Sequence, residues 1–350
     1  SLYIAQLANN ELTYEKKHEL NFGIDAGFLN NRINFTFDIY SRRNYDLIGV
    51  INTLGTGGEP RKYGNVAKMK SNGVEIALNT VNIKTKDFTW TTDLIYSHMH
   101  NEVTELNTLN RMYDYISGSG FTMPGYPQRS LFSIPFMGLN NEGLPTFLDQ
   151  DGNVSVTGIN MQEYDPERLK FLKYEGPVDP TDVGSLGNVF RYKGVTLNLF
   201  ITYSFGNVVR LDPVFSSSYS DLTATPKEFK DRWVKPGDEN FTNVPVIASK
   251  QQLNNIAFLS RAYQAYNYST ERVAKGDFIR MKEISLAYEF PKSITQPLRL
   301  SNLSLKLMAT NLFLIYADKK LNGQDPEFFN AGGVANPMPK QFTLTLKLGI

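Results

Sequence analysis

Residues 20–39 read LNFGIDAGFLNNRINFTFDI, and this stretch decides the fold class. Apolar side chains occupy every second position from Leu20 to Phe28 and again from Ile33 to Ile39, with polar residues or glycine between them. Successive residues of a β-strand point to opposite faces of a sheet, so each half has one apolar and one polar face. A short turn is expected at residues 29–32. The stretch therefore predicts a β-hairpin.

The same alternation recurs along the chain. After the hairpin it is found at residues 74–78, 88–97, 195–201, 284–290, 303–307 and 342–348. A weaker strand is expected at about 182–192. The sequence therefore predicts an all-β, antiparallel protein of about nine strands.

The connections between these strands alternate in length. Short links are expected near 29–32, 83–87, 193–194 and 291–302, and long loops near 49–72, 104–181, 206–276 and 317–340. One end of the sheet therefore carries tight turns and the other end long loops. In outer-membrane β-barrels the short turns are periplasmic and the long loops extracellular. The pattern predicts one arc of a transmembrane β-barrel, spanning residues 1–350 and integral to a Gram-negative outer membrane.

The composition excludes several other classes of protein. Lys and Arg number 36 against 35 Asp and Glu, so the chain lacks the basic surface of a nucleic-acid-binding protein. It has no cysteine, which excludes a disulfide framework and thiolate metal sites. No run of about 18 apolar residues occurs, so no transmembrane helix is predicted. A transmembrane strand needs only about 9–11 residues, half of them facing lipid, so the alternation still fits a membrane protein.

A soluble β-sandwich is the alternative interpretation of the same alternation. Two features favour the barrel. The long loops fall at one end only, whereas the loops of a sandwich cluster at both ends. Aromatic residues also gather near strand ends, as in the girdles of membrane barrels; they are Phe28, Tyr40, Phe88, Tyr203, Phe205, Phe290 and Tyr316.

Seven segments carry more specific motifs, at residues 12–25, 71–76, 192–207, 232–245, 276–282, 311–327 and 337–342. Examples are SNGVEI at 71–76, GDFIRMK at 276–282 and GQDPE at 323–327. In this order they resemble the C-terminal half of the SusC/RagA family of TonB-linked outer-membrane proteins. Tyr14 stands where the family usually has Trp, and the chain ends on Ile350 instead of an aromatic residue. The plug domain and TonB box of the family have no counterpart in these residues.

The resemblance implies a plugged barrel of about 22 strands, of which this chain would supply the last nine or so. It implies TonB-dependent import of oligosaccharides or oligopeptides, with a SusD-like lipoprotein as a lid on the extracellular loops. The expected partners are the N-terminal part of the same transporter, the lid, TonB acting through the plug, outer-membrane lipid and the cargo. A passive porin and a soluble carbohydrate-binding module are the competing functions.

No catalytic constellation occurs, and the chain is not expected to be an enzyme. The three histidines are His18, His98 and His100, and none lies in a nucleophile or acid–base motif. His98 and His100 share a strand face and are weak candidates for metal binding. No cofactor is expected. Asp149, Asp151 and Asn153 form an oxygen-rich turn, at which a calcium site stays an alternative to a plain turn. The turn is not an EF-hand, because Asn160 stands where an EF-hand needs Glu.

The long loops are expected to carry the function. The loop at 206–276 contains aromatic residues among amides and cations, a combination that suits stacking on sugar rings or peptide backbones. The candidate contacts to ligand or lid are Trp233, Phe229, Tyr263, Tyr266, Tyr268 and Arg261. The alternative is that these side chains pack the loops together, because large loops need cores of their own. Arg280 and Lys282 are expected to face the lumen and to form ion pairs with neighbouring strands.

Overall fold

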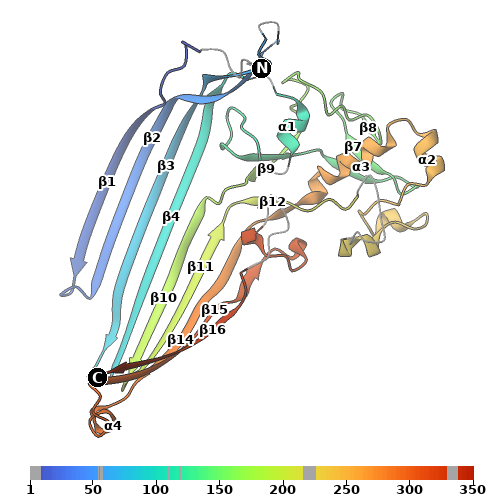
Figure 1. The fold of residues 1–350 in the computed structure, drawn as a ribbon. Coiled ribbons are helices and arrows are strands. Elements are labelled where there is room, and N and C mark those ends of the chain that lie inside the picture. Colours follow the sequence, from blue (N-terminus) through green and yellow to red (C-terminus); the bar gives the residue numbers. More distant parts are fainter. Residues whose placement is uncertain are drawn as a thin grey trace, which may run out of the picture.

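The computed structural model describes residues 9–53, 55, 58–108, 110–117, 120–215, 226–328 and 338–350. Within these residues one antiparallel sheet forms a curved wall, and a separate group of loops lies beside one end of it (Figure 1). The sheet has nine strands in the order β1-β2-β3-β4-β10-β11-β14-β15-β16, so each strand pairs with its neighbour along the wall. The predicted fold class, an antiparallel barrel arc of about nine strands, is confirmed.

The strands of the wall are long. They are β1 Lys16–Phe28, β2 Ile33–Asn52, β3 Arg61–Lys84, β4 Phe88–Leu106, β10 Asp182–Tyr192, β11 Val195–Phe205, β14 Phe278–Glu289, β15 Asn302–Ala317 and β16 Gln341–Gly349. Most of them exceed the roughly 9–11 residues that cross a bilayer. The wall therefore extends beyond the thickness of a hydrocarbon core.

The connections follow the predicted alternation, with one correction. The short links are residues 29–32, 85–87, 193–194 and 290–301, the last holding α4 (Lys292–Thr295). The long ones are residues 107–181, 206–277 and 318–340. The predicted loop at 49–72 is wrong in extent, because β2 continues to Asn52 and β3 already begins at Arg61. The alternation that marks a strand fades there although the pairing continues, because the register of β2 against β3 shifts between Asn44 and Leu47 and again between Leu47 and Ile48.

The register gives the wall two chemically different faces. Ile24, Phe37, Ile76 and Tyr96 lie directly opposite one another across β1–β4. One residue further along β1, Asp25 lies opposite Thr36, whose hydroxyl donates a 2.6 Å hydrogen bond to the Asp25 carboxylate. We call the face of the wall that carries Ile24 the apolar face, and the face that carries Asp25 the polar face. Strict period-two alternation in the sequence produces both of them.

The prediction that Tyr40 belongs to an aromatic girdle is wrong, because its side chain does not lie on the apolar face. It is two residues from Asp38, so it belongs to the polar face, and only 6% of it is exposed. Its ring lies over Gly73, its cross-strand partner, in the space that a Cβ atom would fill. The Arg42 guanidinium stacks on the same ring, 4.0 Å from its centroid. The glycine of the SNGVEI motif is therefore explained by the close approach of this tyrosine.

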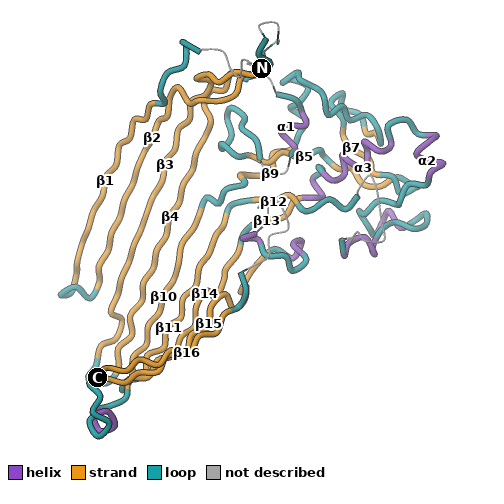
Figure 2. The backbone as a smooth tube through the Cα atoms, in the orientation of Figure 1, coloured by secondary structure: helices purple, strands orange, loops and turns teal. Residues whose placement is uncertain are grey.

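The loops at the other end form a second layer, which we call the loop domain (residues 107–181 and 206–277). Figure 2 shows its short strands and helices beside the long strands of the wall. Its strands are β5 Ser130–Ser133, β6 Phe136–Leu139, β7 Pro145–Leu148, β8 Val154–Ser155, β9 Lys173–Pro177, β12 Val208–Arg210 and β13 Val273–Lys275. Its helices are α1 Met112–Ile116, α2 Lys250–Asn255 and α3 Leu259–Asn267, with 3₁₀ turns η1 Lys227–Asp231, η2 Asp238–Asn240 and η3 Thr270–Arg272. The last loop adds η4 Lys319–Leu321 and η5 Pro326–Phe328.

Among the helices that the structure describes, none combines the length and apolar character needed to span a membrane. The buried apolar core of the described chain lies in the loop domain, not in the wall. It is built around Met112, Ile116, Phe147 and Leu259, all at most 1% exposed. In contrast, the strands of the wall leave large apolar side chains such as Leu20 and Phe342 exposed.

Candidate functional site

The predicted ligand-binding aromatics lie mostly inside the loop domain. Helix α3 turns Leu259, Ala262, Tyr263 and Tyr266 toward one side, as the helical spacing of i, i+3 and i+4 requires. Tyr266 is 2% exposed and Tyr263 is 8% exposed. The Tyr263 hydroxyl donates a 2.6 Å hydrogen bond to the carbonyl of Val246. Both rings contact the ring of Phe215.

Trp233 is also enclosed. Its ring lies against Gly143, which has a φ of +73° and no side chain to compete for the space. The indole N–H donates a 2.8 Å hydrogen bond to the carboxylate of Glu239. This hydrogen bond, with those from the backbone at residues 237 and 239, holds the pKa of Glu239 below its usual range. Trp233 therefore fastens two segments of the loop domain together.

The other three candidates are less buried. Phe229 is half-buried against the core and contacts Phe215. Tyr268 shares a 3.2 Å hydrogen bond with the hydroxyl of Tyr113. Burial, and then this hydrogen bond, raise the pKa of Tyr268 to about 12. Arg261 is exposed, with its guanidinium 4.3 Å from the ring centroid of Phe258. The packing interpretation thus fits Trp233, Tyr263 and Tyr266, whereas contact with ligand or lid by any of the six stays a prediction.

Arg210 in β12 is a central residue of the loop domain that the sequence did not reveal. Its guanidinium donates hydrogen bonds to the carbonyls of Phe132 (2.7 Å), Ser269 (2.9 Å) and Ile116 (3.3 Å), and to the hydroxyl of Ser133 (3.1 Å). Burial lowers the pKa of Arg210 to about 10. One cation therefore joins α1, β5 and the segment before η3. A lone arginine beside two valines carries no sequence signal for such a role.

A hollow lies where the loop domain meets the wall. Its volume is about 360 Å³, and Arg129, Asp179, Ser204, Asn207 and Glu327 are among its lining residues. The Arg129 guanidinium and the Asp179 carboxylate are 2.6 Å apart across an ion pair. Polar groups of both signs thus surround an opening at the loop end of the polar face.

Arg280 closes one side of this region. It is 6% exposed, and it forms ion pairs with Asp325 and with Glu327, whose Oε2 lies 3.0 Å from the arginine Nε. Lys282 adds a longer contact of 3.8 Å to Glu327. The prediction that these two residues form ion pairs with neighbouring strands is therefore wrong in the partner, because both pair with residues of the GQDPE loop. The reason is that β14 begins at Phe278, so Arg280 lies at the end of the strand where this loop folds back.

Two metal sites were considered from the sequence, the His98 and His100 pair and the turn at Asp149. In each of them one residue forms hydrogen bonds within the chain. His98 lies on the apolar face with its Nδ1 atom 2.9 Å from the Asp182 carboxylate, which also accepts a 2.7 Å hydrogen bond from Tyr96. The Asp149 carboxylate accepts hydrogen bonds from the backbone of residues 151 and 153 and from the hydroxyl of Ser155. In the residues that the structure describes, no three His, Asp or Glu side chains are grouped to hold a metal ion. Calcium at this turn stays a prediction.

Comparison with known proteins agrees with this architecture. Residues 2–212 match the family described as TonB dependent receptor-like, beta-barrel. A TonB-dependent receptor of Formosa agariphila is 26% identical over 380 residues, which cover 95% of this chain and 34% of the relative. The TonB-dependent receptor SusC of Bacteroides thetaiotaomicron is 26% identical over 360 residues, covering 98% of this chain and 32% of that protein.

The structural comparison gives the same fold. The RagAB peptide transporter superimposes with a TM-score of 0.74 and 23% identity, covering 99% of this chain and 36% of the transporter chain. The chain thus spans about a third of the length of the relatives that it matches. Since the family match covers more than half of its 350 residues, the chain belongs to the TonB-dependent receptor family and forms part of its β-barrel.

Proposed function

We propose that the chain is the C-terminal arc of the barrel of an outer-membrane TonB-dependent importer, with its long loops on the extracellular side. The observation that carries the proposal is the wall itself, with one apolar face and with β1 and β16 at its two edges. In lipid every backbone N–H and C=O group needs a partner within the protein. An arc with open edges therefore has to close against further strands. The longer relatives have the length to supply such strands and a plug.

The proposed cargo is an oligosaccharide or an oligopeptide. Cargo of that size would pass the hollow of about 360 Å³ between the loop domain and the wall before entering the lumen. Lumen-facing polar groups such as Asp38, Glu75 and Asp93 would line its further path. Movement against a gradient would need TonB, acting on the plug of the complete transporter. Both the structural likeness to a peptide transporter and the likeness to SusC support import of this kind.

The proposed lid is a SusD-like lipoprotein seated on the loop domain. Large apolar side chains stand exposed on its segment 234–258, with Phe241 90% exposed and Phe258 58% exposed. An apolar surface of this kind on a loop domain is typical of a protein–protein interface. The guanidinium of Arg261 over Phe258 would place a cation at the rim of this interface.

Co-purification tests the lid. The complete transporter, extracted in mild detergent through a tag on this chain, should bring a SusD-like lipoprotein with it. Replacing Phe241 and Phe258 by Ser should lower the recovered lipoprotein about tenfold, because aromatic anchors dominate such interfaces. Val154→Ser, at an apolar position on β8 that is 57% exposed and thus comparable to Phe258, is the matched control and should change nothing. Equal recovery from all variants would overturn the proposed contact.

Uptake by cells tests the import itself. Accumulation of labelled oligosaccharide or oligopeptide should stop when TonB is deleted, because the plug then stays closed. Uptake that continues at the same rate without TonB would show a passive porin instead. Recovery of the protein in the soluble fraction without detergent would exclude both functions.

A further inference from the structure

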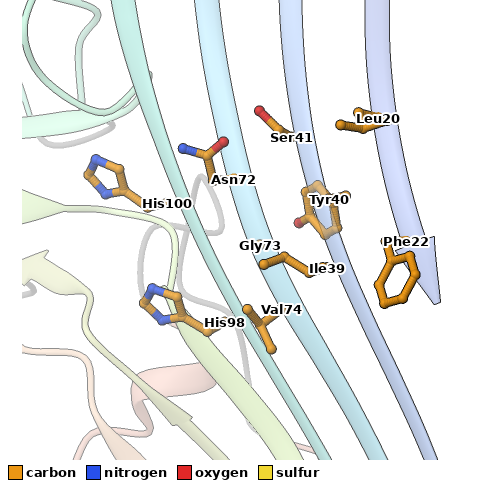
Figure 3. Close-up of a pocket in the computed structure, with 10 residues that line it drawn as sticks. All are labelled: Leu20, Phe22, Ile39, Tyr40, Ser41, Asn72, Gly73, Val74, His98 and His100. Carbon is orange, nitrogen blue, oxygen red and sulfur yellow. The ribbon is translucent and has the colours of Figure 1, made fainter. Parts of the chain in front are cut away.

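A shallow hollow lies on the apolar face of the wall, away from the loop domain. Its volume is about 370 Å³, and its lining is mostly apolar. Leu20 and Phe22 come from β1, Ile39 from β2 and Val74 from β3, and these residues lie on one face by register. Figure 3 shows Leu20 and Phe22 on the outermost strand and the two histidines His98 and His100 across the hollow from them. This hollow faces lipid if the chain is part of an outer-membrane barrel.

The loop-side edge of the hollow is polar, and cations lie directly beyond it. Leu20, Ser41, Asn72 and His100 form one cross-strand row. The next row on the same face is His18, Arg43, Lys70 and Glu102. Two residues along a strand correspond to about 7 Å. The sheet therefore changes from apolar to cationic over the distance that separates the acyl chains of a lipid from its headgroup.

Arg43 is the residue of this row that has capacity for a ligand. It is exposed, and within the described ranges no hydrogen bond or ion pair engages its guanidinium. Lys70 and Glu102 form an ion pair of 2.9 Å, so the charges of these two residues neutralise each other. The His18 ring packs edge-on against Tyr45, with centroids 5.5 Å apart, and keeps its position beside Arg43. A second cation, Lys16, lies further out and pairs with Asp46 at 2.7 Å.

We propose that this face binds a glycolipid of the outer leaflet that carries phosphate on its sugar headgroup. The phosphate would lie between Arg43 and His18, where the planar guanidinium can donate two parallel hydrogen bonds to its oxygens. Ser41, Asn72 and His100 would contact the sugar and ester oxygens, and one acyl chain would fill the hollow over Phe22 and Ile39. The proposal rests on the proposed placement in an outer membrane with the loops outward. That orientation sets the cationic row at the level of the outer-leaflet phosphates.

The apolar hollow and the free arginine together select this ligand. A free phosphate ion would use Arg43 but gain nothing from the hollow. An uncharged lipid would use the hollow but leave Arg43 without a partner. Basic side chains just beyond an apolar transmembrane surface are the arrangement that recognises anionic lipid headgroups.

Native mass spectrometry of the complete transporter in detergent tests the site. Titration with a bis-phosphorylated, acylated glucosamine disaccharide should give a saturable bound state. Arg43→Gln should weaken that binding roughly tenfold, as expected for loss of a charge-assisted hydrogen bond. Arg42→Gln removes the same charge from the adjacent residue, whose side chain lies on the polar face beside Tyr40, and should leave binding unchanged. Leu20→Gln should weaken the phosphorylated and dephosphorylated glycolipids alike.

Three results with the glycolipid and its variants would overturn the proposal. They are binding by Arg43→Gln within twofold of the parent, equal loss in Arg42→Gln, and equally tight binding of the dephosphorylated glycolipid. Tighter binding of an anionic diacyl phospholipid than of the glycolipid would also refute the assigned ligand. Cargo uptake is not part of the measurement, so a failure of the importer proposal would show separately. The transporter is first extracted from isolated outer membranes with detergent, and this extraction reports whether the chain is in the outer membrane.

Discussion

Arg210 shows how a single residue can organise the loop domain. Its guanidinium satisfies three backbone carbonyls and one hydroxyl that are otherwise enclosed. Arg210→Met would leave several of these acceptors buried without a donor, at a cost of about 3 kcal/mol. Amide hydrogen exchange of β5 and η3 should therefore accelerate by about two orders of magnitude. Arg261→Met, at an exposed cation over Phe258, is the control and should cost less than about 1 kcal/mol. Equal exchange in the two variants would contradict the role of Arg210.

Gly143 and Gly152 separate backbone strain from side-chain packing. Both have positive φ, +73° and +80°, but only at Gly143 would a Cβ atom meet the ring of Trp233, whereas Gly152 has open space. Each substitution to Ala costs about 1–2 kcal/mol of strain. Gly143→Ala should also displace Trp233 and shift its fluorescence to longer wavelength. The chain has two tryptophans, so the measurement uses a Trp90→Phe background, and subtracting the spectrum of that background leaves the change at Trp233. A similar spectrum for both variants would mean that the ring does not depend on Gly143.

Tyr268 gives the loop domain a dependence on pH at the alkaline side. Its pKa in the folded chain is about 12, above the usual value near 10, because burial and Tyr113 favour the neutral hydroxyl. A group with a raised pKa contributes stability that is complete below the unfolded pKa and is lost as pH rises through the folded one. The contribution of Tyr268 should therefore decline between pH 10 and 12. Tyr113→Phe should lower the pKa of Tyr268, followed by NMR of ¹³C-labelled tyrosine rings. An unchanged titration would contradict the coupling.

At the scale of elements, β14 holds the last loop through Arg280. Both Arg280 and the carboxylate of Asp325 are largely buried, so breaking their ion pair leaves a buried charge without compensation. Arg280→Gln should destabilise the packing of η5 by about 3 kcal/mol, seen as faster proteolysis within residues 322–328. Lys282→Gln removes only a longer, more exposed ion pair and should cost less than about 1 kcal/mol. Comparable cleavage of the two variants would place the anchor of this loop elsewhere.

Elements of the wall could be predicted because their sequence signal and their packing have the same cause. Apolar and polar residues alternate at Leu20–Phe28 because the two faces of this strand meet different surroundings. The turn at 29–32 has the predicted limits. Even the weaker strand at 182–192 is confirmed as β10. The ends of β2 and β3 could not be predicted, because the register shifts on both sides of Leu47 interrupt the period of two.

The loop domain could not be derived in the same way. Its strands are two to five residues long, too short for a period to show. The sequence leaves two interpretations open for its aromatic residues, contact with ligand or lid and packing of the loops. Whether such rings face a ligand or a core depends on contacts between residues far apart in the sequence, such as Phe215 with Tyr266, which are 51 positions apart. No local pattern encodes contacts of that range.

For the whole molecule, the two faces of the wall decide between a membrane barrel and a soluble sheet. In a barrel the apolar face meets lipid and the polar face meets water, whereas a sandwich buries one face against another sheet. Leu94 lies on the apolar face between Leu78 and Leu186, and its neighbour Ile95 lies on the polar face. Leu94→Arg and Ile95→Arg therefore introduce the same cation one residue apart on opposite sides.

Only the first of these variants should impair assembly. An arginine facing the middle of the bilayer costs about 2–4 kcal/mol, whereas one facing the aqueous lumen costs little. The complete transporter carrying Leu94→Arg should thus be depleted among heat-modifiable proteins of the outer-membrane fraction, while Ile95→Arg should be recovered like the parent. Ile95 is 54% exposed in the arc, which leaves room for the longer side chain. Equal recovery of both variants, or a larger loss for Ile95→Arg, would mean that the face assigned to lipid is not the one that lipid touches.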